Sequence, residues 1–318
     1  MIRAGYFPER RAAMDLKQLE AFVYVVKLNS FSKAADTIYL SQPTISAHIS
    51  SLEKELGTQL LVRSTKEVYP TKVGVEFFSY AQNMLALRDQ AIQSVSGLGH
   101  NSRGEISVLS SSVPAQYLLP EIVTAFRRRY PNIIIRVHQS NSNLVSAKLG
   151  NCYYDVGIVG TKIQGNKFIQ EPFCDDTLVF VYPADLDIDE AIIGKNLVDF
   201  IRSQPFIMRE TGSGTLQELD RYLKKHDLSL DDLKPACYMD STQGVMQAVS
   251  SGMGISFLSK AATALYVQMG LVKTIEVDHQ FFLRRFYLLL KKDMVLSPVQ
   301  KLLVDFIAQY YYGIKEPA

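Results

Sequence analysis

The chain has 318 residues, of which 47% are hydrophobic and 21% charged, and its formal net charge at pH 7 is +2. This length exceeds one domain of ~100–200 residues, so we expect at least two folding units in a globular protein. No stretch reaches the ~18 consecutive apolar residues that span a bilayer, and the first residues lack an apolar signal segment, which argues against a membrane protein and favours the cytoplasm.

The cysteines Cys152, Cys174 and Cys237 lie far apart and form no CxxC pair. This usage fits a reducing compartment and argues against a disulfide framework and a zinc site. We expect the three to be buried small hydrophobic residues, with a redox switch as the alternative, and we expect no metal and no cofactor. Residues 1–13 precede a second methionine and read as an extension or tag.

The first hundred residues have no excess of basic residues that would indicate DNA binding. Between Asp15 and Leu98 there are eight Lys/Arg and eight Asp/Glu. An indication of DNA binding therefore has to come from the sequence pattern.

The pattern predicts three helices in succession. Asp15 and Gln18 form a capping-box sequence, and apolar residues then recur at helical spacing up to Asn29. A short second helix begins near Phe31 with Ser32 as its cap, and a turn leads to the third helix.

The third helix has Pro43 in its first turn and ends at Gly57. Its apolar face leaves small and hydrogen-bonding residues outward, a composition that suits a major groove. The alternative is a solvated edge of a three-helix bundle.

The segment from Ser30 to Gly74 resembles the DNA-binding signature of LysR-type transcriptional regulators. The resemblance rests on Ala34-Ala35, Ser41-Gln42-Pro43, Leu56-Gly57 and Thr71-Lys72-Val73-Gly74. It implies an N-terminal winged helix-turn-helix over residues 14–70 that binds double-stranded promoter DNA through the first half of the third helix.

The residues that this resemblance places at DNA are Ser32, Gln42, Pro43, Thr44, Ser46, Ala47, Ser50, Arg63, Lys66 and Lys72. Ala47 departs from the family, in which many members have a basic residue there, and it could contact a thymine methyl group. Arg63, Lys66 and Lys72 would contact phosphates, with a structural ion pair as the alternative for Arg63.

A long linker helix is expected over residues 71–98, with Thr71 as its N-cap, followed by a hinge over residues 99–104. Its apolar residues form two stripes, one through Phe78 and Leu85 and one through Phe77 and Met84. The third helix of the same domain could cover one stripe and a twofold-related copy the other. The resemblance implies a homodimer, commonly extended to a homotetramer.

From Glu105 onward, β-branched runs alternate with amphipathic helices, which predicts α/β sheets with parallel crossovers. We expect strands near Ile106–Leu109, Ile133–Val137, Val156–Val159, Leu178–Tyr182, Phe206–Met208, Ile255–Leu258 and Arg285–Leu290. We expect helices near Pro114–Tyr130, Asn143–Gly150, Thr215–His226, Thr242–Gly252 and Pro298–Tyr310.

This half resembles the LysR-type effector-binding domain through Tyr117–Pro120, Asp155–Ile158 and Gly252–Ile255. The resemblance implies a periplasmic-binding-protein-like fold of type 2 over residues 105–318. Subdomain I would comprise residues 105–182 and 280–318 and subdomain II residues 183–279, with crossings near Pro183 and near His279. The fold class is therefore α/β plus all-α.

Four strand-to-helix junctions are rich in hydroxyl groups, and such helix starts favour an anion. In chain order they are Ser110–Ser112, Ser140–Ser142, Arg209–Thr215 and Asp240–Gln243. Gly160-Thr161 could add a fifth. The expected effector-binding residues are Ser110, Ser111, Ser112, Ser140, Asn141, Ser142, Thr161, Arg209, Thr211, Ser213, Thr215 and Gln243. The alternative for any one junction is plain helix capping.

Arg209 is the one cation inside a junction, and it could meet the ligand or pair with Glu210. Only Tyr117 and Tyr238 bring rings close to the junctions in sequence, so we expect a small anion. The Ser-rich first junction together with Arg209–Thr215 is similar to family members that control sulfur and related oxyanion metabolism. This similarity points to sulfate-like or selenium oxyanions.

No sequence motif indicates an enzyme, since GxSxG and HExxH are absent and the five histidines are scattered. RNA polymerase is a further candidate partner. The rival function is a ligand-binding module whose helix-turn-helix serves protein contacts instead of DNA.

Overall fold

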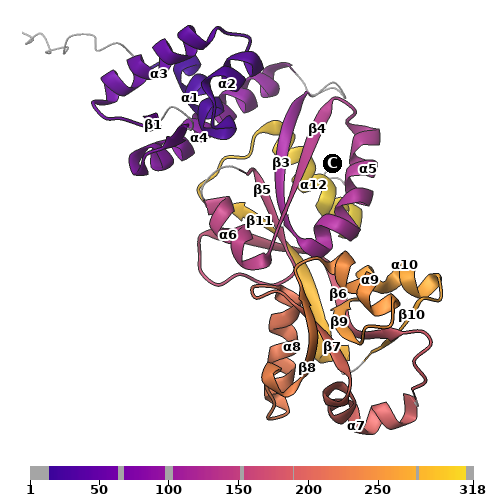
Figure 1. Cartoon of the computed structure of the whole chain (residues 1–318). Coiled ribbons are helices and arrows are strands. Elements are labelled where there is room, and N and C mark those ends of the chain that lie inside the picture. The colour runs from indigo at the N-terminus through magenta and orange to yellow at the C-terminus, as the bar shows by residue number, and fades with distance from the viewer. Residues whose placement is uncertain are drawn as a thin grey trace, which may run out of the picture. The chain divides into compact units, whose positions relative to one another are not determined.

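The computed structural model describes residues 14–63, 68–96, 103–150, 154–188, 190–276 and 279–312. The course of the chain is drawn in Figure 1. These residues divide between two compact units. The amino-terminal unit holds 14–96 and Asp293–Lys301, and the carboxy-terminal unit holds the remaining described residues.

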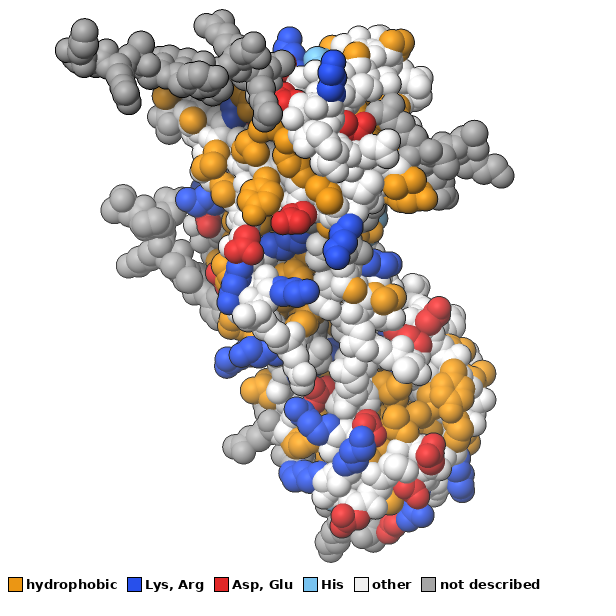
Figure 2. Space-filling model, turned by 90° about the vertical axis from the view of Figure 1, so that its left-hand side faces the viewer, with side chains coloured by type: hydrophobic (Ala, Val, Ile, Leu, Met, Phe, Trp, Pro, Cys, Tyr) orange, Lys and Arg blue, Asp and Glu red, His pale blue; other side chains and the backbone are white. Residues whose placement is uncertain are grey.

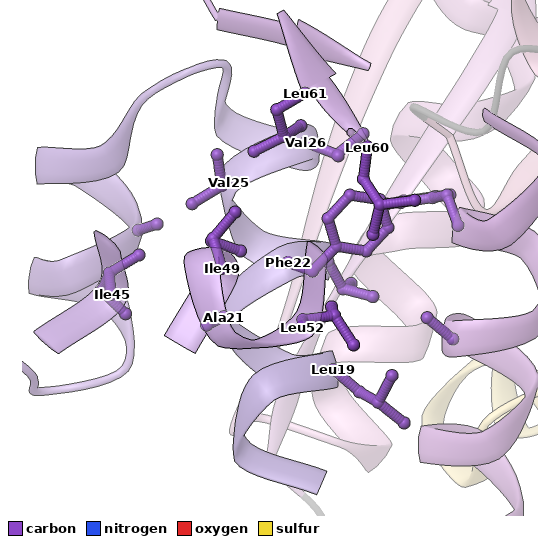
Figure 3. Packing of buried hydrophobic residues seen from close by; sticks show 14 of the residues in the cluster. Leu19, Ala21, Phe22, Val25, Val26, Ile45, Ile49, Leu52, Leu60 and Leu61 are labelled. Atoms are coloured by element: carbon purple, nitrogen blue, oxygen red, sulfur yellow. The ribbon is translucent and has the colours of Figure 1, made fainter. Parts of the chain in front are cut away.

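The amino-terminal unit is a winged helix-turn-helix, as predicted. Its helices are α1 (Leu16–Leu28), α2 (Phe31–Thr37) and α3 (Gln42–Leu56). The wing is the antiparallel pair β1 (Leu61–Arg63) and β2 (Val68–Pro70). Apolar side chains of α1 and α3 pack in one cluster, which Leu60 and Leu61 join (Figure 3).

Side-chain caps define where these helices begin and end. The predicted capping box of Asp15 and Gln18 is present at α1. The Ser41 side chain accepts a hydrogen bond from the Thr44 N–H at the start of α3, and Gly57 ends that helix in the left-handed region at φ 67°.

The predicted cap of the second helix was wrong. Ser30, not Ser32, is the N-cap of α2, because Ser30 has an extended backbone and its side chain accepts a hydrogen bond from the Lys33 N–H. Ser32 lies inside the first turn, where its hydroxyl donates to Gln42 Oε1 at 3.4 Å.

The linker helix α4 (Lys72–Ser96) packs chiefly on α1, rather than on the third helix as predicted. Phe22 of α1 contacts Phe77 and Phe78 of α4, with ring centroids 5.5 and 6.2 Å apart. The N-cap Thr71 is confirmed, since its hydroxyl accepts from the Gly74 N–H at 3.0 Å. The part of the predicted hinge before Arg103 lies outside the described residues.

A second face of α4 is exposed. Val73, Tyr80 and Leu87 follow one another at seven-residue spacing and are 48%, 60% and 54% exposed. Residues seven apart lie on the same side of a helix. Leu85, by contrast, packs against the core of the amino-terminal unit, as do Phe77 and Met84 of the other predicted stripe. Residues of both predicted stripes therefore face the same core, and the exposed apolar face is a third one.

The carboxy-terminal unit begins with parallel strands. Strand β3 (Gly104–Ser111) pairs with β4 (Ile133–Ser140) and with β5 (Val156–Val159). A turn of π-helix, η1 (Pro114–Leu118), leads into α5 (Leu119–Arg129) after β3. Helix α6 (Ser142–Gly150) follows β4. These crossovers are the parallel α/β units that the sequence predicted.

Two antiparallel strands continue this sheet. Strand β11 (Leu283–Lys291) pairs with β5 and with the first part of β6 (Phe168–Pro183). The second part of β6 pairs with β9 (Ser256–Ser259) and β10 (Val272–Ile275). The partners of β6 change between Thr177 and Leu178, whereas the predicted crossing at Pro183 lies at the end of the strand.

A smaller parallel pair, β7 (Pro205–Arg209) and β8 (Lys234–Met239), completes the strands of the described chain. Phe206 bridges to Ile255, which joins this pair to the region of β9. The remaining helices of the described chain are α7 (Glu190–Ser203), α8 (Gly214–Lys225), η2 (Leu230–Asp232), α9 (Thr242–Ser250), α10 (Lys260–Gln268), α11 (His279–Phe282) and α12 (Pro298–Tyr312).

The surface carries mixed charge. Lys and Arg side chains are interspersed with Asp and Glu over the face shown in Figure 2, in keeping with the small net charge. Within the described ranges no helix is long and apolar enough to cross a bilayer. The same residues contain no group of three or more His, Cys, Asp or Glu that could hold a metal ion.

The cysteines are less buried than predicted. Cys174 and Cys237 are half-buried free thiols, and Cys152 lies outside the described residues. Burial, followed by the nearby carboxylates of Asp176 and Asp175, raises the pKa of the Cys174 thiol to about 11. This thiol therefore stays protonated at neutral pH, which disfavours the redox-switch alternative at this position.

Candidate functional site

A polar pocket of about 280 Å³ opens in the carboxy-terminal unit where α6 and α8 begin. Its lining residues are Ser111, Ser112, Val113, Asn141, Ser142, Gly160, Arg209, Glu210, Ser213, Gly214, Thr215, Arg284 and Phe286. This volume includes the open mouth of the pocket, and the enclosed part is about 20 Å³, on the order of one water molecule. The site therefore suits a small ligand.

The structure brings together most of the residues expected at the effector. Those that line the pocket are Ser111, Ser112, Asn141, Ser142, Arg209, Ser213 and Thr215. They come from three of the four hydroxyl-rich junctions. The proposed fifth junction contributes Gly160 to the lining.

The other expected residues lie outside the lining. Ser110 is fully buried, and its hydroxyl donates to the Ser111 carbonyl. It is absent from the lining because neighbouring residues of a strand face opposite sides, and Ser111 faces the pocket. Thr211 and Gln243 are exposed, and Ser140 and Thr161 are half-buried.

The starts of α6 and α8 approach each other closely at the pocket. A Cβ added at Gly214 would lie 3.1 Å from Ser142 Oγ and 3.2 Å from Thr161 Cγ2, so a larger residue would require one of these side chains to shift. One turn further along α8, Gln217 Nε2 donates to Asn143 Oδ1 at 3.1 Å. The pocket is thus flanked by two helix amino termini, each of which carries a partial positive charge.

The hydroxyl groups at these helix starts differ in their tasks. Asn141 Oδ1 accepts from the Leu144 N–H at 2.9 Å, so this side chain caps α6. Ser213 is the N-cap residue of α8, but its side chain makes no capping hydrogen bond. The plain capping role therefore applies to Asn141 and not to Ser213.

Arg209 is held by three neighbours. It forms a two-point ion pair with Glu210, through Nε at 2.8 Å and Nη2 at 3.1 Å. Its Nη1 donates to Thr242 Oγ1 at 2.7 Å and its Nη2 to the Asp240 carbonyl at 3.5 Å. Of the two roles that the sequence left open, this geometry favours pairing with Glu210.

Truncation of Arg209, which clamps Glu210 to Thr242 and the Asp240 carbonyl, is expected to destabilise the carboxy-terminal unit. Arg209 is 4% exposed, and removal of one partner from a buried ion pair costs about 3–5 kcal/mol of unfolding free energy. Arg209→Ala should show that loss in urea denaturation followed by circular dichroism. Arg136→Ala is the control, since both side chains of its pair with Glu105 are exposed, at 60% and 45%, and the pair should contribute less than about 1 kcal/mol. Equal stability of the two variants would contradict the clamp.

A second arginine in the lining was missed by the sequence analysis. Arg284 of β11 donates from Nε to Asp176 Oδ2 at 2.8 Å, and Asp176 Oδ1 accepts from Ser259 Oγ at 2.7 Å. The Arg284 guanidinium also lies over the Phe286 ring, 5.3 Å from its centroid. One signal was present: Arg284 shares the alternate-residue face of its strand with Phe286 and Leu288, both buried.

The fourth junction faces a different space. Glu210, Tyr238, Met239, Asp240, Ser241 and Gly244 line an open depression of about 810 Å³. The Arg209 contacts with Thr242 and Asp240 connect this junction to the first pocket. Near the same arginine, burial raises the pKa of the Tyr117 hydroxyl, which therefore stays a neutral donor at physiological pH.

The candidate DNA edge lies on α3 and its surroundings. Gln42, Pro43, Ala47 and Ser50 are exposed, and Thr44 and Ser46 are half-buried beside them. Ser32 and Lys72 are also exposed. The side chain of Arg63 and the whole of Lys66 lie outside what the structure describes.

Family models match almost the whole described chain. Residues 99–311 match the LysR substrate binding domain, and residues 16–75 match the bacterial regulatory helix-turn-helix protein of the lysR family. The HTH-type transcriptional regulator CysL of Bacillus subtilis is 32% identical over 247 residues, which are 76% of this chain and 80% of that protein.

Solved structures share the fold. Full-length OxyR C199D from Pseudomonas aeruginosa superposes with a TM-score of 0.71 at 20% identity, over 93% of this chain and 95% of that one. The regulatory domain of Synechocystis PCC6803 CcmR in complex with 2-PG has a TM-score of 0.59 at 21% identity. That match covers 67% of this chain and 99% of the CcmR domain.

Proposed function

The chain belongs to the LysR family of DNA-binding transcriptional regulators with an effector-binding domain, and on that premise we propose that its effector is a small anion. The proposed site is the pocket at the starts of α6 and α8. The observation that carries the proposal is the balance of donors and acceptors in its lining. Binding of the anion would alter how the regulator acts at its promoter.

The lining presents hydrogen-bond donors to a ligand, and its one carboxylate is already bound by an arginine. Glu210 is the acidic residue of the lining, and both of its oxygens are engaged by Arg209. The remaining polar side chains are hydroxyls, the Asn141 amide and two guanidinium groups. Together with two helix starts, this set favours a negative ligand over a cation.

A small ligand is in keeping with the pocket and with a protein of the same fold. The pocket with its open mouth measures about 280 Å³, and the CcmR regulatory domain was solved with 2-PG bound. The lining contains one ring, Phe286, which already lies under Arg284. A large planar ligand would find little free surface for stacking.

The other parts of the proposal follow the family assignment. Gln42, Pro43, Thr44, Ser46 and Ala47 would face bases, while Ser32, Ser50, Arg63, Lys66 and Lys72 would lie at the DNA backbone or the edge of the groove. The protein would act in the cytoplasm as a homodimer or homotetramer and would catalyse no reaction. Residues 14–70, 71–98 and 105–318 would be its functional divisions.

Calorimetry with sulfate, phosphate and short carboxylates tests the proposed ligand. Ser213→Ala should weaken anion binding about fivefold, since a neutral hydrogen bond contributes about 1 kcal/mol. Thr211→Ala is the matched control, because Thr211 is exposed and lies outside the lining. Saturable binding of a bulky apolar ligand, with all of the small anions silent, would contradict the anion effector.

A further inference from the structure

We propose that Arg284 is the residue that meets the charge of the ligand, and that the pocket selects a compact oxyanion through it. This inference rests on the proposed anion effector and names the residue that would recognise it. It also changes the part assigned to Arg209, the cation that stood out in the sequence.

Arg284 has a hydrogen-bond donor that no described residue accepts from. Its side chain is 8% exposed, and its Nη2 is buried without a hydrogen-bond partner among the described residues. A buried polar group without a partner costs about 1–3 kcal/mol and more when it is charged. Such a group needs a partner in the functional state, and an oxyanion in the pocket would supply one.

The position of this donor is fixed from three sides. Asp176 faces Arg284 across the β6–β11 pair and binds its Nε. The Phe286 ring lies beneath the guanidinium, and Thr215 Oγ1 accepts from Nη1 at 3.5 Å. A guanidinium held in this way loses little further conformational freedom when it binds an anion.

The surrounding groups complete a donor set. Arg284 lines the pocket beside Thr215 at the first turn of α8, and Ser213 adds a hydroxyl that caps no helix. Ser142 approaches the same point from the start of α6. A guanidinium, hydroxyls and two helix amino termini together match the oxygens of a sulfate-like, phosphate-like or carboxylate anion.

Arg209 has less to offer the same ligand. Its Nε, Nη1 and Nη2 each donate to Glu210, Thr242 or the Asp240 carbonyl. Its charge is balanced by a carboxylate bound at two points. Arg284 also pairs with a carboxylate, but only through Nε, and the other oxygen of Asp176 is engaged by Ser259.

The test uses the full-length chain with sulfate, phosphate and acetate as probes. Calorimetry is run at constant ionic strength in chloride, so that screening is the same throughout. Arg284→Gln alone leaves the Asp176 carboxylate uncompensated and could unfold the unit. The double variant Arg284→Gln with Asp176→Asn removes both charges; Asp176→Asn keeps the shape of its side chain, and Arg284→Gln keeps a polar amide on a shorter one.

Arg285→Gln is the matched control. Arg285 is the next residue of β11, is 55% exposed, pairs with the exposed Asp175 and lies outside the lining. It removes one arginine from the same strand without touching the pocket. Circular dichroism of all variants reports whether each is folded.

We expect the unmodified protein and the Arg285→Gln variant to bind an oxyanion saturably. We expect binding at least tenfold weaker in the folded double variant, because hydrogen bonds to charged groups are the stronger class. Undiminished binding by the double variant would overturn the role of Arg284 and leave the anion effector in place. Failure of the unmodified protein to bind any of the three probes would overturn both.

Discussion

Replacement of Ser46 by glutamate is expected to reduce binding at the specific DNA site to the level of binding to unrelated DNA. Ser46 is half-buried in the first half of α3, beside the exposed Pro43 and Ala47. A carboxylate there would enter a groove flanked by phosphates, and it would replace a side chain that can donate a hydrogen bond. Specific binding typically exceeds non-specific binding by about 10³-fold or more, which sets the scale of the loss.

The measurement is a gel-shift titration at fixed salt, with DNA from the region upstream of the gene. Ser46→Ala keeps the size small and should cost far less, about tenfold. Thr124→Glu adds the same charge at an exposed site of α5 and should bind as the unmodified protein does. Undiminished affinity of a folded Ser46→Glu protein would show that this edge of α3 does not read DNA.

The helix-turn-helix could be predicted closely because its determinants are local. The cap Asp15, the proline at the start of α3 and the glycine at its end are all read within a few residues. The one error, at Ser32, came from two serines on either side of Phe31. Either could cap a helix, and the backbone at Ser30 decided between them.

The strands of the carboxy-terminal unit were harder to predict where pairing overrides local pattern. The first part of β6 contains Glu171, Pro172 and Asp175 and has no apolar periodicity, yet it pairs along its length with β11. Strands β8 and β10 were missed for a similar reason, since each is short and partly exposed. Sheet partners lie far apart in the chain, and no window of sequence contains both.

The pocket was predicted in part. Hydroxyl-rich junctions could be recognised singly, and Ser111, Ser142, Ser213 and Thr215 do meet at one pocket. The contact of Arg284 with Asp176 joins residues 108 positions apart and depends on the register of β6 and β11. The engagement of Arg209 by Thr242 likewise joins separate junctions. Charge partners of this kind follow from the assembled fold.

The exposed stripe of α4 leads to the second prediction, that Leu87→Glu converts the dimer to a monomer. Val73, Tyr80 and Leu87 repeat at seven residues and are 48%, 60% and 54% exposed, although each side chain is largely apolar. A twofold-related α4 that covered this stripe would place two Leu87 side chains in the interface. Two glutamates would forfeit about 3 kcal/mol or more of apolar burial and would carry like charges, so the dimer should weaken more than 100-fold.

Light scattering across a dilution series measures the mass directly. Leu265→Glu is the matched control, because Leu265 is 62% exposed on α10 and lies in the other unit. It should leave the mass unchanged. Leu85→Glu should instead lower the stability of the amino-terminal unit, since Leu85 packs against the core that contains Phe22. A folded Leu87→Glu protein with the mass of the unmodified dimer would show that the stripe is covered in some other way.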